Sequence, residues 1–407
     1  MDRIGMKQAA CTIVSFNYLP YARALCESFL ATHPGRSFHV LLVDRMPAGY
    51  DSSQEPFELL PVEQLEIPDF LSTAFKYDIL ELNTNVKPSF LRHLLNRGIE
   101  HLLYLDPDIF VYKELTPVFE ALSHSAIVLT PHMLSPANDD VRQEVILLSA
   151  GVFNLGFIAV KQCTETDRFL LWWEQRCLHD AFDEQRAGMF VDQKWINFVP
   201  CFFDSVHILK HPGCNMAYWN LHERKLSGDD GSWTVNEDAP LLFFHFSGIS
   251  VDGGERISKF TNRYTLSNRA DLRLIFEEYR AALVRHGIRD ASGNRYAFGS
   301  FDNGQPIHRL CRSIYAANLD RFGGEDPFRS HGRFYPWASR KGLLGSGNAA
   351  KHPTPATYSK DHVGVRAIHG ALRMALRILG ADRYMMLMKY LSHISILRNQ
   401  KDVFRAN

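Results

Sequence analysis

Residues 9–44 read AACTIVSFNYLPYARALCESFLATHPGRSFHVLLVD, and this stretch decides the fold class. Its two short apolar runs, 9–14 and 38–44, are typical of buried strands, and the apolar residues between them recur at helical spacing. A strand, a helix and a strand within about 35 residues form a βαβ unit, which predicts a parallel sheet. Ligands of such sheets bind beyond the carboxyl ends of the strands. The residues expected at that edge are Ser15, Asn17 and Asp44.

A further apolar run, HLLYL at residues 101–105, leads directly into the acids Asp106 and Asp108. Two carboxylates two residues apart at the end of a buried strand are costly to keep ionised without a cation. Paired oxygen ligands suit Mg²⁺ or Mn²⁺, which also bind a substrate diphosphate. The alternative interpretation is an ordinary acidic turn after a strand.

The imidazole of His245 follows the apolar run LLFF at residues 241–244 and precedes Ser247 and Gly248. A histidine in an apolar strand is more often a core residue than a ligand. Here it stands at a strand end, which the sheet rule puts on the same edge as the two acids. A neutral imidazole there could complete the protein ligands of a metal ion.

Other candidates have both a structural and a functional interpretation. Asp192, followed by Gln193, suits a helix N-cap, or it presents a polar pair beside a reacting group. Lys87 and Lys259 are candidate partners of a diphosphate, or solvated surface lysines. The stretch NMAYWNL at residues 215–221 combines amides and aromatic rings that suit sugars, although buried aromatic side chains usually belong to the core.

Composition limits the class of protein. Hydrophobic residues make up 46% and charged residues 22% of the 407, so a packed core is feasible. The formal net charge of zero removes any global electrostatic argument for binding nucleic acid. Residues 303–407 contain 17 Lys and Arg against 6 Asp and Glu, so their net charge of +11 leaves −11 on residues 1–302. This basic segment indicates a surface partner.

The sequence favours a cytoplasmic protein. Its seven scattered cysteines, without a C-x-x-C pair, fit a reducing compartment. The first ten residues lack the apolar core of a signal peptide, and no window approaches the roughly 18–20 apolar residues that span a bilayer. Arg366, Arg373 and Arg377 beside an apolar helical face favour a peripheral position at the inner face of a membrane. Alternatively, that helix packs its apolar face on the catalytic domain.

Five motifs stand in the order found in the GT-A fold glycosyltransferases, and the chain resembles family eight of these enzymes and its bacterial relatives. The motifs are TIVSFNYLP (12–20), YLDPDI (104–109), FNLG (153–156), DQ (192–193) with Asn197 close behind, and HFSG (245–248). The third motif lies in GVFNLGFIAV (151–160), which predicts a strand with a turn at Asn154.

The resemblance implies a GT-A fold, an α/β architecture with a mainly parallel mixed sheet flanked by helices, here followed by a helical C-terminal extension. It also implies transfer of a hexose from a nucleotide-diphosphate sugar, expected to be a UDP-sugar, to a glycan or glycolipid acceptor with retention of configuration. Mn²⁺ or Mg²⁺ would bind Asp106, Asp108 and His245. The residues implied at the donor are Ser15, Asn17, Asp44, Lys87, Asp106 and Lys259, and those at the reaction centre are Asn154, Asp192 and Gln193.

Two positions depart from the family pattern, which indicates a divergent branch. Residues 249–254 stand where a Lys-Pro pair usually follows H-F-x-G, and this leaves Lys259 as a more distant diphosphate partner. Val86-Lys87-Pro88 stands near the place of the usual Tyr-Ala-Arg. An inverting transferase and a catalytically silent sugar-nucleotide-binding or scaffold protein are the alternatives. A nucleotidyltransferase is disfavoured, because it usually has a Gly-rich basic loop where residues 16–20 stand.

Changes in composition predict four segments. A catalytic domain is expected over residues 8–265, a helical extension over 266–344, a flexible linker over 345–360 and basic amphipathic helices over 361–407. In the last segment Gly380 interrupts the helical pattern.

Overall fold

The computed structural model describes residues 7–138, 140–229, 232–291, 293–345, 363–400 and 403. The chain forms two compact units. The first comprises the residues up to Phe70 together with Ile79–Ala297, and the second comprises Leu71–Asp78 together with the residues from Phe298 onward. Every candidate site residue named above belongs to the first unit.

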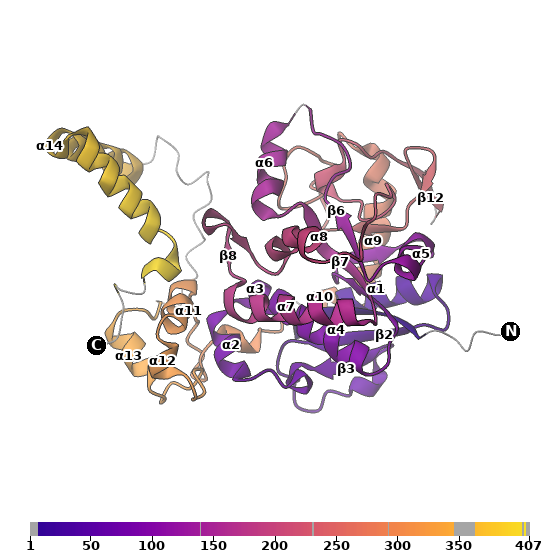
Figure 1. The fold of residues 1–407 in the computed structure, drawn as a ribbon, viewed down its shortest axis with the longest axis horizontal. Helices are drawn as coiled ribbons and strands as arrows, with labels where there is room; N and C mark the ends of the chain where they lie inside the picture. Colours follow the sequence, from indigo (N-terminus) through magenta and orange to yellow (C-terminus); the bar gives the residue numbers. More distant parts are fainter. Residues whose placement is uncertain are drawn as a thin grey trace. The chain divides into compact units, whose positions relative to one another are not determined.

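A seven-stranded sheet forms the centre of the first unit (Figure 1). Its order is β10-β6-β7-β4-β1-β2-β3, and the pairings are parallel except those of β7 with β4 and β6. The strands are β1 (Gln8–Val14), β2 (Ser37–Leu42), β3 (Glu58–Pro61), β4 (His101–Leu105), β6 (Ile127–Pro131), β7 (Phe153–Lys161) and β10 (Val206–Ile208). The predicted fold class, a mainly parallel mixed sheet, is confirmed.

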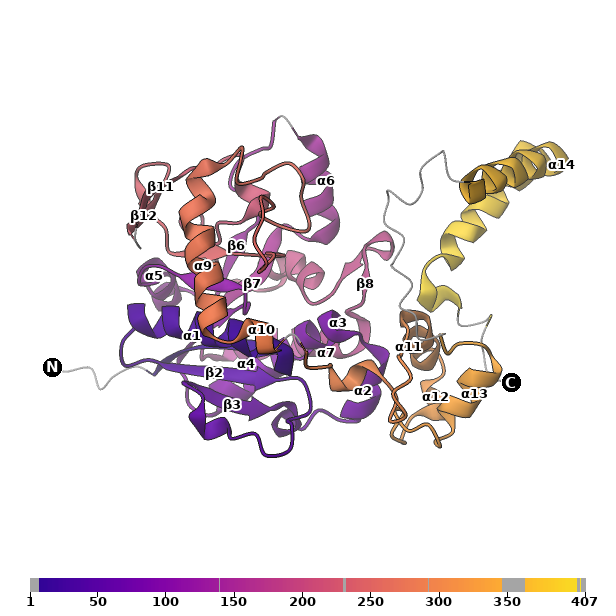
Figure 2. The same cartoon turned by 180° about the vertical axis from the view of Figure 1, so that it is seen from behind.

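Helices cover both faces of this sheet. On one face, α1 (Leu19–Thr32) and α5 (Thr116–His124) share a core with Leu103 of β4 and Phe157 of β7. Side chains alternate along a strand, so Tyr104 points to the other face, where Lys87 of α4 (Lys87–Asn96) lies over its ring. Helices α3 (Ile79–Asn85) and α7 (Thr164–Asp180) pack beside α4. Figures 1 and 2, seen from opposite sides, show α4 and α7 in front in one view and α1 in the other.

Shorter elements complete the first unit. Strand β5 (Ile109–Val111) pairs antiparallel with β14 (Phe243–His245), which places His245 opposite Ile109. Helix α9 (Arg273–Arg285) packs Tyr279 on Phe246, with ring centroids 4.0 Å apart. Besides short 3-10 helices, the other strands and α-helices described in this unit are α6 (Val141–Ala150), β8 (Asp183–Glu184), β9 (Met189–Phe190), α8 (Val199–Phe202), β11 (Leu226–Asp229), β12 (Ser232–Val235), β13 (Ala239–Pro240) and α10 (Ile288–Ala291).

The turn predicted at Asn154 is wrong. Strand β7 runs unbroken from Phe153 to Lys161, and Asn154 lies inside it. Asparagine favours turns because its side chain competes for nearby backbone groups. Here that side chain bonds to other side chains instead, and the bend falls at Gly151, whose φ is 126°.

The second unit is helical. It contains α2 (Phe70–Lys76) from residue 71 onward, α11 (Arg309–Ala316), α12 (Leu319–Phe322), α13 (Phe334–Arg340) and α14 (Val363–Ile394). The ring of Phe75 contacts the rings of Tyr315 and Phe334, with centroids 4.7 and 5.3 Å apart. The buried Arg312 donates hydrogen bonds to the carbonyls of Ala74, Phe75, Tyr77 and Phe298. Residues 71–78 are therefore built into this unit.

The predicted interruption of the C-terminal helix is confirmed, because Gly380 has non-helical φ and ψ of 73° and 167° inside α14. The linker predicted over residues 345–360 lies outside the described residues except for Gly345. Among the helices described, none combines the length and the apolar character needed to cross a bilayer.

Candidate active site

Two carboxylates and an imidazole meet at the carboxyl end of β4. Asp106 and Asp108 lie in the turn between β4 and β5, and β14 ends at His245. The Nε2 atom of His245 is 3.0 Å from Oδ1 of Asp108 and 3.8 Å from Oδ2 of Asp106. One ligand atom from each side chain lies within 4.8 Å of the others. The structure therefore brings together the three residues predicted as metal ligands.

This cluster suits a divalent cation. The carboxylates of Asp106 and Asp108 are 30% and 23% exposed, whereas His245 is 4% exposed, so the oxygen atoms are open to a ligand. Burial raises the pKa of Asp106, and the charges of Lys87 and His245 partly oppose this. Burial lowers the pKa of His245, but Asp108 and Asp106 outweigh it and raise that pKa. Carboxylate oxygens with one imidazole are a ligand set that Mg²⁺ and Mn²⁺ accept.

Asn215 orients His245 by bonding to Nδ1, the ring nitrogen that faces away from the two acids. The Nδ1 atom of His245 lies 3.3 Å from Oδ1 of Asn215, which accepts the Nδ1–H, so Nε2 is the ring nitrogen that faces the acids. Asn215 is fully buried and has a φ of 56°, a left-handed conformation that asparagine tolerates better than most residues. Its amide is thus fixed in the orientation that a ligating histidine requires.

A buried hydrogen-bond chain continues from Asn215 to the residues predicted at the reaction centre. Nδ2 of Asn215 donates to Oδ1 of Asn154 at 3.0 Å, and Nδ2 of Asn154 lies 3.2 Å from Nε2 of His132. Burial lowers the pKa of His132 to about 4, so its ring is neutral at pH 7 and Nε2 accepts that bond. The orientation of Asn154 is therefore coupled to that of His245.

The glycine of FNLG makes room for the imidazole. A Cβ atom at Gly156 would lie 2.4 Å from Cε1 of His245 and 2.9 Å from Oδ1 of Asn154. Both neighbours are buried and hydrogen-bonded, so neither can move aside at low cost. Glycine at this position is a condition for the site's geometry.

Lys87 and Asp192 form a buried ion pair next to Tyr104, the residue two positions before Asp106. Nζ of Lys87 is 2.7 Å from Oδ2 of Asp192, and the side chains are 1% and 2% exposed. Nζ also donates to the carbonyl of Leu155 at 2.8 Å and lies 4.2 Å from the ring centroid of Tyr104. Asp192 stands at the N-cap of the 3-10 helix Gln193–Phe198 but makes no capping bond with its side chain. Burial raises the pKa of Asp192, and Lys87 opposes this rise.

The amide of Gln193 is held at both ends by backbone groups. Oε1 accepts from the N–H of Leu155 at 2.9 Å, and Nε2 donates to the carbonyl of Ala150 at 3.1 Å. Gln193 therefore holds the backbone at Ala150 and Leu155, on either side of Asn154, and the side chains of Gln193 and Asn154 belong to the same part of the site.

Ser15, Asn17 and Asp44 meet at the carboxyl ends of β1 and β2. Oγ of Ser15 donates to Oδ1 of Asn17 at 2.7 Å. The buried Asp44 accepts from the N–H groups of Phe16, Arg45 and Ala297 at 3.2, 2.8 and 2.9 Å. Burial raises the pKa of Asp44, and these backbone donors lower it. Asp44 thus holds the turn that presents the half-buried Asn17.

Lys259 lies beside the HFSG motif although ten residues separate it from Gly248. The N–H of Lys259 donates to the carbonyl of Gly248 at 2.9 Å, so residues 249–258 form a loop that returns to the motif. The side chain of Lys259 is exposed, and Nζ lies 5.0 Å from the ring centroid of Phe260.

Four residues of the site were missed as candidates from the sequence: Tyr104, His132, Asn215 and Trp219. The hydroxyl of Tyr104 donates to Oδ1 of Asp106 at 2.8 Å. The ring of Trp219 lies edge-on to both His245 and His132, at centroid distances of 5.1 and 5.3 Å. Asn215 and Trp219 belong to the stretch noted for its amides and rings. For His132 the only signal in the sequence was its place just past the short strand expected at residues 126–130, with Pro131 between.

Comparison with known proteins gives relatives without an assigned function. No protein-family profile matches the sequence. The chain is similar to YfnF of Bacillus subtilis (strain 168), with 27% identity over 283 residues that cover 68% of this chain and 92% of the relative. It is also similar to YfnD of the same organism, with 27% identity over 287 residues, 67% of this chain and 88% of the relative. Both relatives are described as uncharacterized.

Among solved structures the chain resembles several glycosyltransferases loosely. One is a galactosyltransferase, LgtC, in complex with donor and acceptor sugar analogues, at a TM-score of 0.39 and 16% identity, covering 67% of this chain and 95% of LgtC. Another is the glycosyltransferase GlyE of Streptococcus pneumoniae TIGR4, at a TM-score of 0.35 and 15% identity, covering 76% of this chain and 73% of GlyE.

Proposed function

We propose that this chain is a metal-dependent glycosyltransferase that moves a hexose from a nucleotide-diphosphate sugar to a glycan or lipid-linked acceptor. One observation carries the proposal: the segments YLDPDI, FNLG, DQ and HFSG, far apart in the sequence, form one connected site. Their resemblance to family eight of the GT-A glycosyltransferases favours a UDP-sugar donor and retention of the anomeric configuration.

Asp106, Asp108 and His245 are the proposed ligands of Mn²⁺ or Mg²⁺, which would supply Lewis acidity toward a leaving diphosphate. Asn215 keeps Nε2 of His245 directed at that position. Ser15 and Asn17 would face the nucleotide. Asp44 would hold the turn after β1 that carries them, because it accepts a hydrogen bond from the N–H of Phe16. The exposed Lys259 would reach the diphosphate from the loop beside Gly248.

At the reaction centre, Asn154 and Gln193 are proposed to line the donor sugar. Because both ends of the Gln193 amide bond to backbone groups, we assign it electrostatic support and positioning. Asp192 forms an ion pair with Lys87, and Lys87 also bonds to the carbonyl of Leu155, so this pair supports the chain next to Asn154. The arrangement therefore favours a structural role for Lys87 over binding of the diphosphate. The acceptor hydroxyl would attack the anomeric carbon while the bond from that carbon to the diphosphate oxygen breaks. The hydroxyl proton would pass to the leaving diphosphate.

A panel of UDP, GDP, CMP and dTDP sugars, each with Mn²⁺ or with EDTA, tests the proposed donor. One nucleotide class is expected to raise the melting temperature, because a ligand present at about 100 times its Kd stabilises the folded state by about 2.7 kcal/mol. The shift is expected to vanish in EDTA and in Asp108→Ala. The measurement is thermal unfolding of the 407-residue protein followed by intrinsic fluorescence.

A surface variant, Asp229→Ala, serves as the control and is expected to keep the shift, since residue 229 is exposed and lies in β11. If no sugar nucleotide changes the melting curve of the wild type, the transferase proposal fails and a silent scaffold takes its place. A shift that persists in EDTA would overturn the metal-dependent form of the proposal.

The second part of the proposal places α14 on an anionic membrane surface. Arg366, Arg373 and Arg377 follow one another at intervals of seven and four residues, so they form one stripe of the helix. The other faces are apolar and open to solvent, with Ile368 60% exposed and Ile378 75% exposed. A helix with a basic stripe and exposed aliphatic side chains is typical of binding to anionic lipid head groups.

Sedimentation with vesicles of phosphatidylcholine, alone or mixed with phosphatidylglycerol, measures this contact. The protein is expected to bind the mixed vesicles, and less so at high salt because screening weakens the attraction. Replacing the three arginines by serine removes about 1 kcal/mol each, so the affinity is expected to fall about 100-fold. The exposed pair Arg142→Ser and Arg186→Ser is the control. Equal binding to neutral vesicles, or a dimer held through α14, would contradict the proposal.

A further inference from the structure

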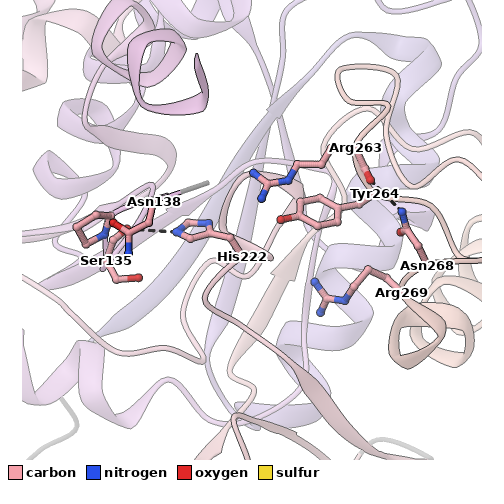
Figure 3. A pocket seen from close by; sticks show the side chains of 8 residues that line it. Ser135, Asn138, His222, Arg263, Tyr264, Asn268 and Arg269 are labelled. Atoms are coloured by element: carbon pink, nitrogen blue, oxygen red, sulfur yellow. Dashed lines mark hydrogen bonds between the residues drawn. The ribbon is translucent and has the colours of Figure 1, made fainter. Parts of the chain in front are cut away.

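A pocket lies in the first unit, and none of the three candidate metal ligands lines it. Its volume is about 690 Å³, within the usual size of sites for small ligands. Three segments line it: the loop after β6, the turn after Trp219 and the loop before α9. The residues that matter here are Ser135, Asn138, His222, Arg263, Tyr264 and Arg269 (Figure 3).

The lining offers hydrogen-bonding groups around one aromatic ring. Figure 3 shows the side chains of Arg263, Tyr264 and Arg269 pointing from their loop toward the side where His222 lies. The guanidinium groups of Arg263 and Arg269 lie over the ring of Tyr264, with Cζ 5.0 and 5.8 Å from its centroid, so the ring supports both of them. Planar guanidinium and amide groups match the paired hydroxyls of a sugar. This combination is suited to carbohydrate.

The charges of the pocket are already balanced within the protein. Arg263 pairs with Asp140 at 3.0 Å, and Arg269 pairs with Asp271 at 2.6 Å. An anionic ligand such as phosphate would have to compete with these carboxylates for the same guanidinium groups. A neutral polyol requires no uncompensated charge, so the pocket favours neutral sugars.

Hydrogen bonds hold these walls in place before any ligand binds. Arg269 donates to the carbonyls of Leu221 and Arg224, both at 2.8 Å, and its side chain is 12% exposed. The N–H and hydroxyl of Ser135 both donate to Glu223, at 2.5 and 2.7 Å. The loop after β6, the turn after Trp219 and the loop before α9 are thus tied together.

The same segments reach the candidate active site. His132, at the end of the hydrogen-bond chain from His245, precedes Ser135 by three residues. Trp219, which lies against both histidines, precedes His222 by three residues. Asn220 joins the two segments by donating to the carbonyl of His132 at 3.0 Å. A saccharide seated in the pocket is therefore separated from the reaction centre by a few residues of two shared segments.

We infer that this pocket is a subsite for neutral sugars of the acceptor, beyond the sugar that reacts. The inference rests on the proposed transferase function for its biological meaning, but binding in the pocket does not require the metal. The probes are lactose, maltose and chitobiose as neutral disaccharides, with inorganic phosphate as the anionic alternative.

Titration calorimetry of the 407-residue protein in EDTA tests the subsite. At least one disaccharide is expected to bind, and Tyr264→Ala is expected to weaken it at least tenfold. Tyr264→Phe keeps the ring and is expected to stay within threefold of the wild type. Because Tyr264 also packs on the core, Asn138→Ala provides a second variant at an exposed position and is expected to weaken binding several-fold.

Tyr390→Ala is the matched control, since this tyrosine is 56% exposed in α14 and is expected to leave binding unchanged. Absence of binding for all three disaccharides overturns the inference, as does binding that Tyr264→Ala and Asn138→Ala leave intact. Displacement by phosphate would reassign the pocket to anions. Saccharide binding in EDTA together with a failed sugar-nucleotide panel would keep the subsite and reject the transferase.

Discussion

Replacement of Lys87 by methionine is expected to lower the free energy of unfolding by about 3–5 kcal/mol, the usual cost of breaking a buried ion pair. The change leaves the carboxylate of Asp192, only 2% exposed, without its partner at 2.7 Å. It also removes the bond from Nζ to the carbonyl of Leu155. Urea unfolding followed by circular dichroism measures the change.

The matched control is Arg97→Met, which breaks a 2.8 Å pair with Glu58 whose side chains are 43% and 44% exposed. An exposed pair contributes at most about 1 kcal/mol, so this variant is expected to unfold close to the wild type. The double variant Lys87→Met with Asp192→Leu is expected to recover most of the loss, because both charges are gone. An equal decrease in the free energy of unfolding of Lys87→Met and Arg97→Met would show that the buried pair stabilises the protein no more than an exposed one.

Asp108→Ala is expected to reduce turnover of the sugar nucleotide by about 10³-fold or more, because loss of transition-state charge stabilisation costs several kcal/mol. Asn215→Ala is expected to act differently. It leaves all three ligands but frees the ring of His245, which lowers metal affinity by about 10–100-fold. Activity measured against Mn²⁺ concentration separates the two variants, since excess metal is expected to restore Asn215→Ala and not Asp108→Ala.

The exposed residue Asp229 again provides the control, and Asp229→Ala is expected to follow the wild-type metal dependence. Full activity of Asp108→Ala would remove this carboxylate from the proposed metal site. A loss in Asn215→Ala that no concentration of Mn²⁺ restores would assign Asn215 to the chemistry itself instead of to the orientation of His245.

Local patterns predicted the sheet and the metal-ligand cluster because each depends on a rule that acts over short distances. Apolar runs indicate strands, and strand ends of a parallel sheet share an edge, so Asp106 and Asp108 after β4 could be placed at that edge. His245 was expected at the same edge, but it reaches the two acids by another route, because β14 pairs antiparallel with β5 outside the seven-stranded sheet. The helix interrupted at Gly380 follows from the same kind of evidence, since glycine readily adopts a φ of 73°.

Other features depend on partners that are remote in the sequence. Asp192 could be an N-cap or a functional acid, and the deciding partner, Lys87, comes from another helix. The strand around Asn154 was misjudged because its side chain bonds to His132 and Asn215. Residues 71–78 gave no sign that they pack with residues beyond 298, since an apolar residue such as Phe75 is compatible with many cores.

Because β14 pairs with β5, the proposed metal site depends on a segment that is synthesised well after the two acids. His245 reaches Ile109 only after the intervening residues have folded back, and the entropy of closing such a loop grows slowly with its length. A nascent chain released before residue 243 would carry both acids but neither the imidazole nor the strand that covers β5. Affinity for a divalent ion at the proposed site would therefore report that synthesis and folding have passed residue 245, and a product truncated before β14 is expected to bind the ion weakly.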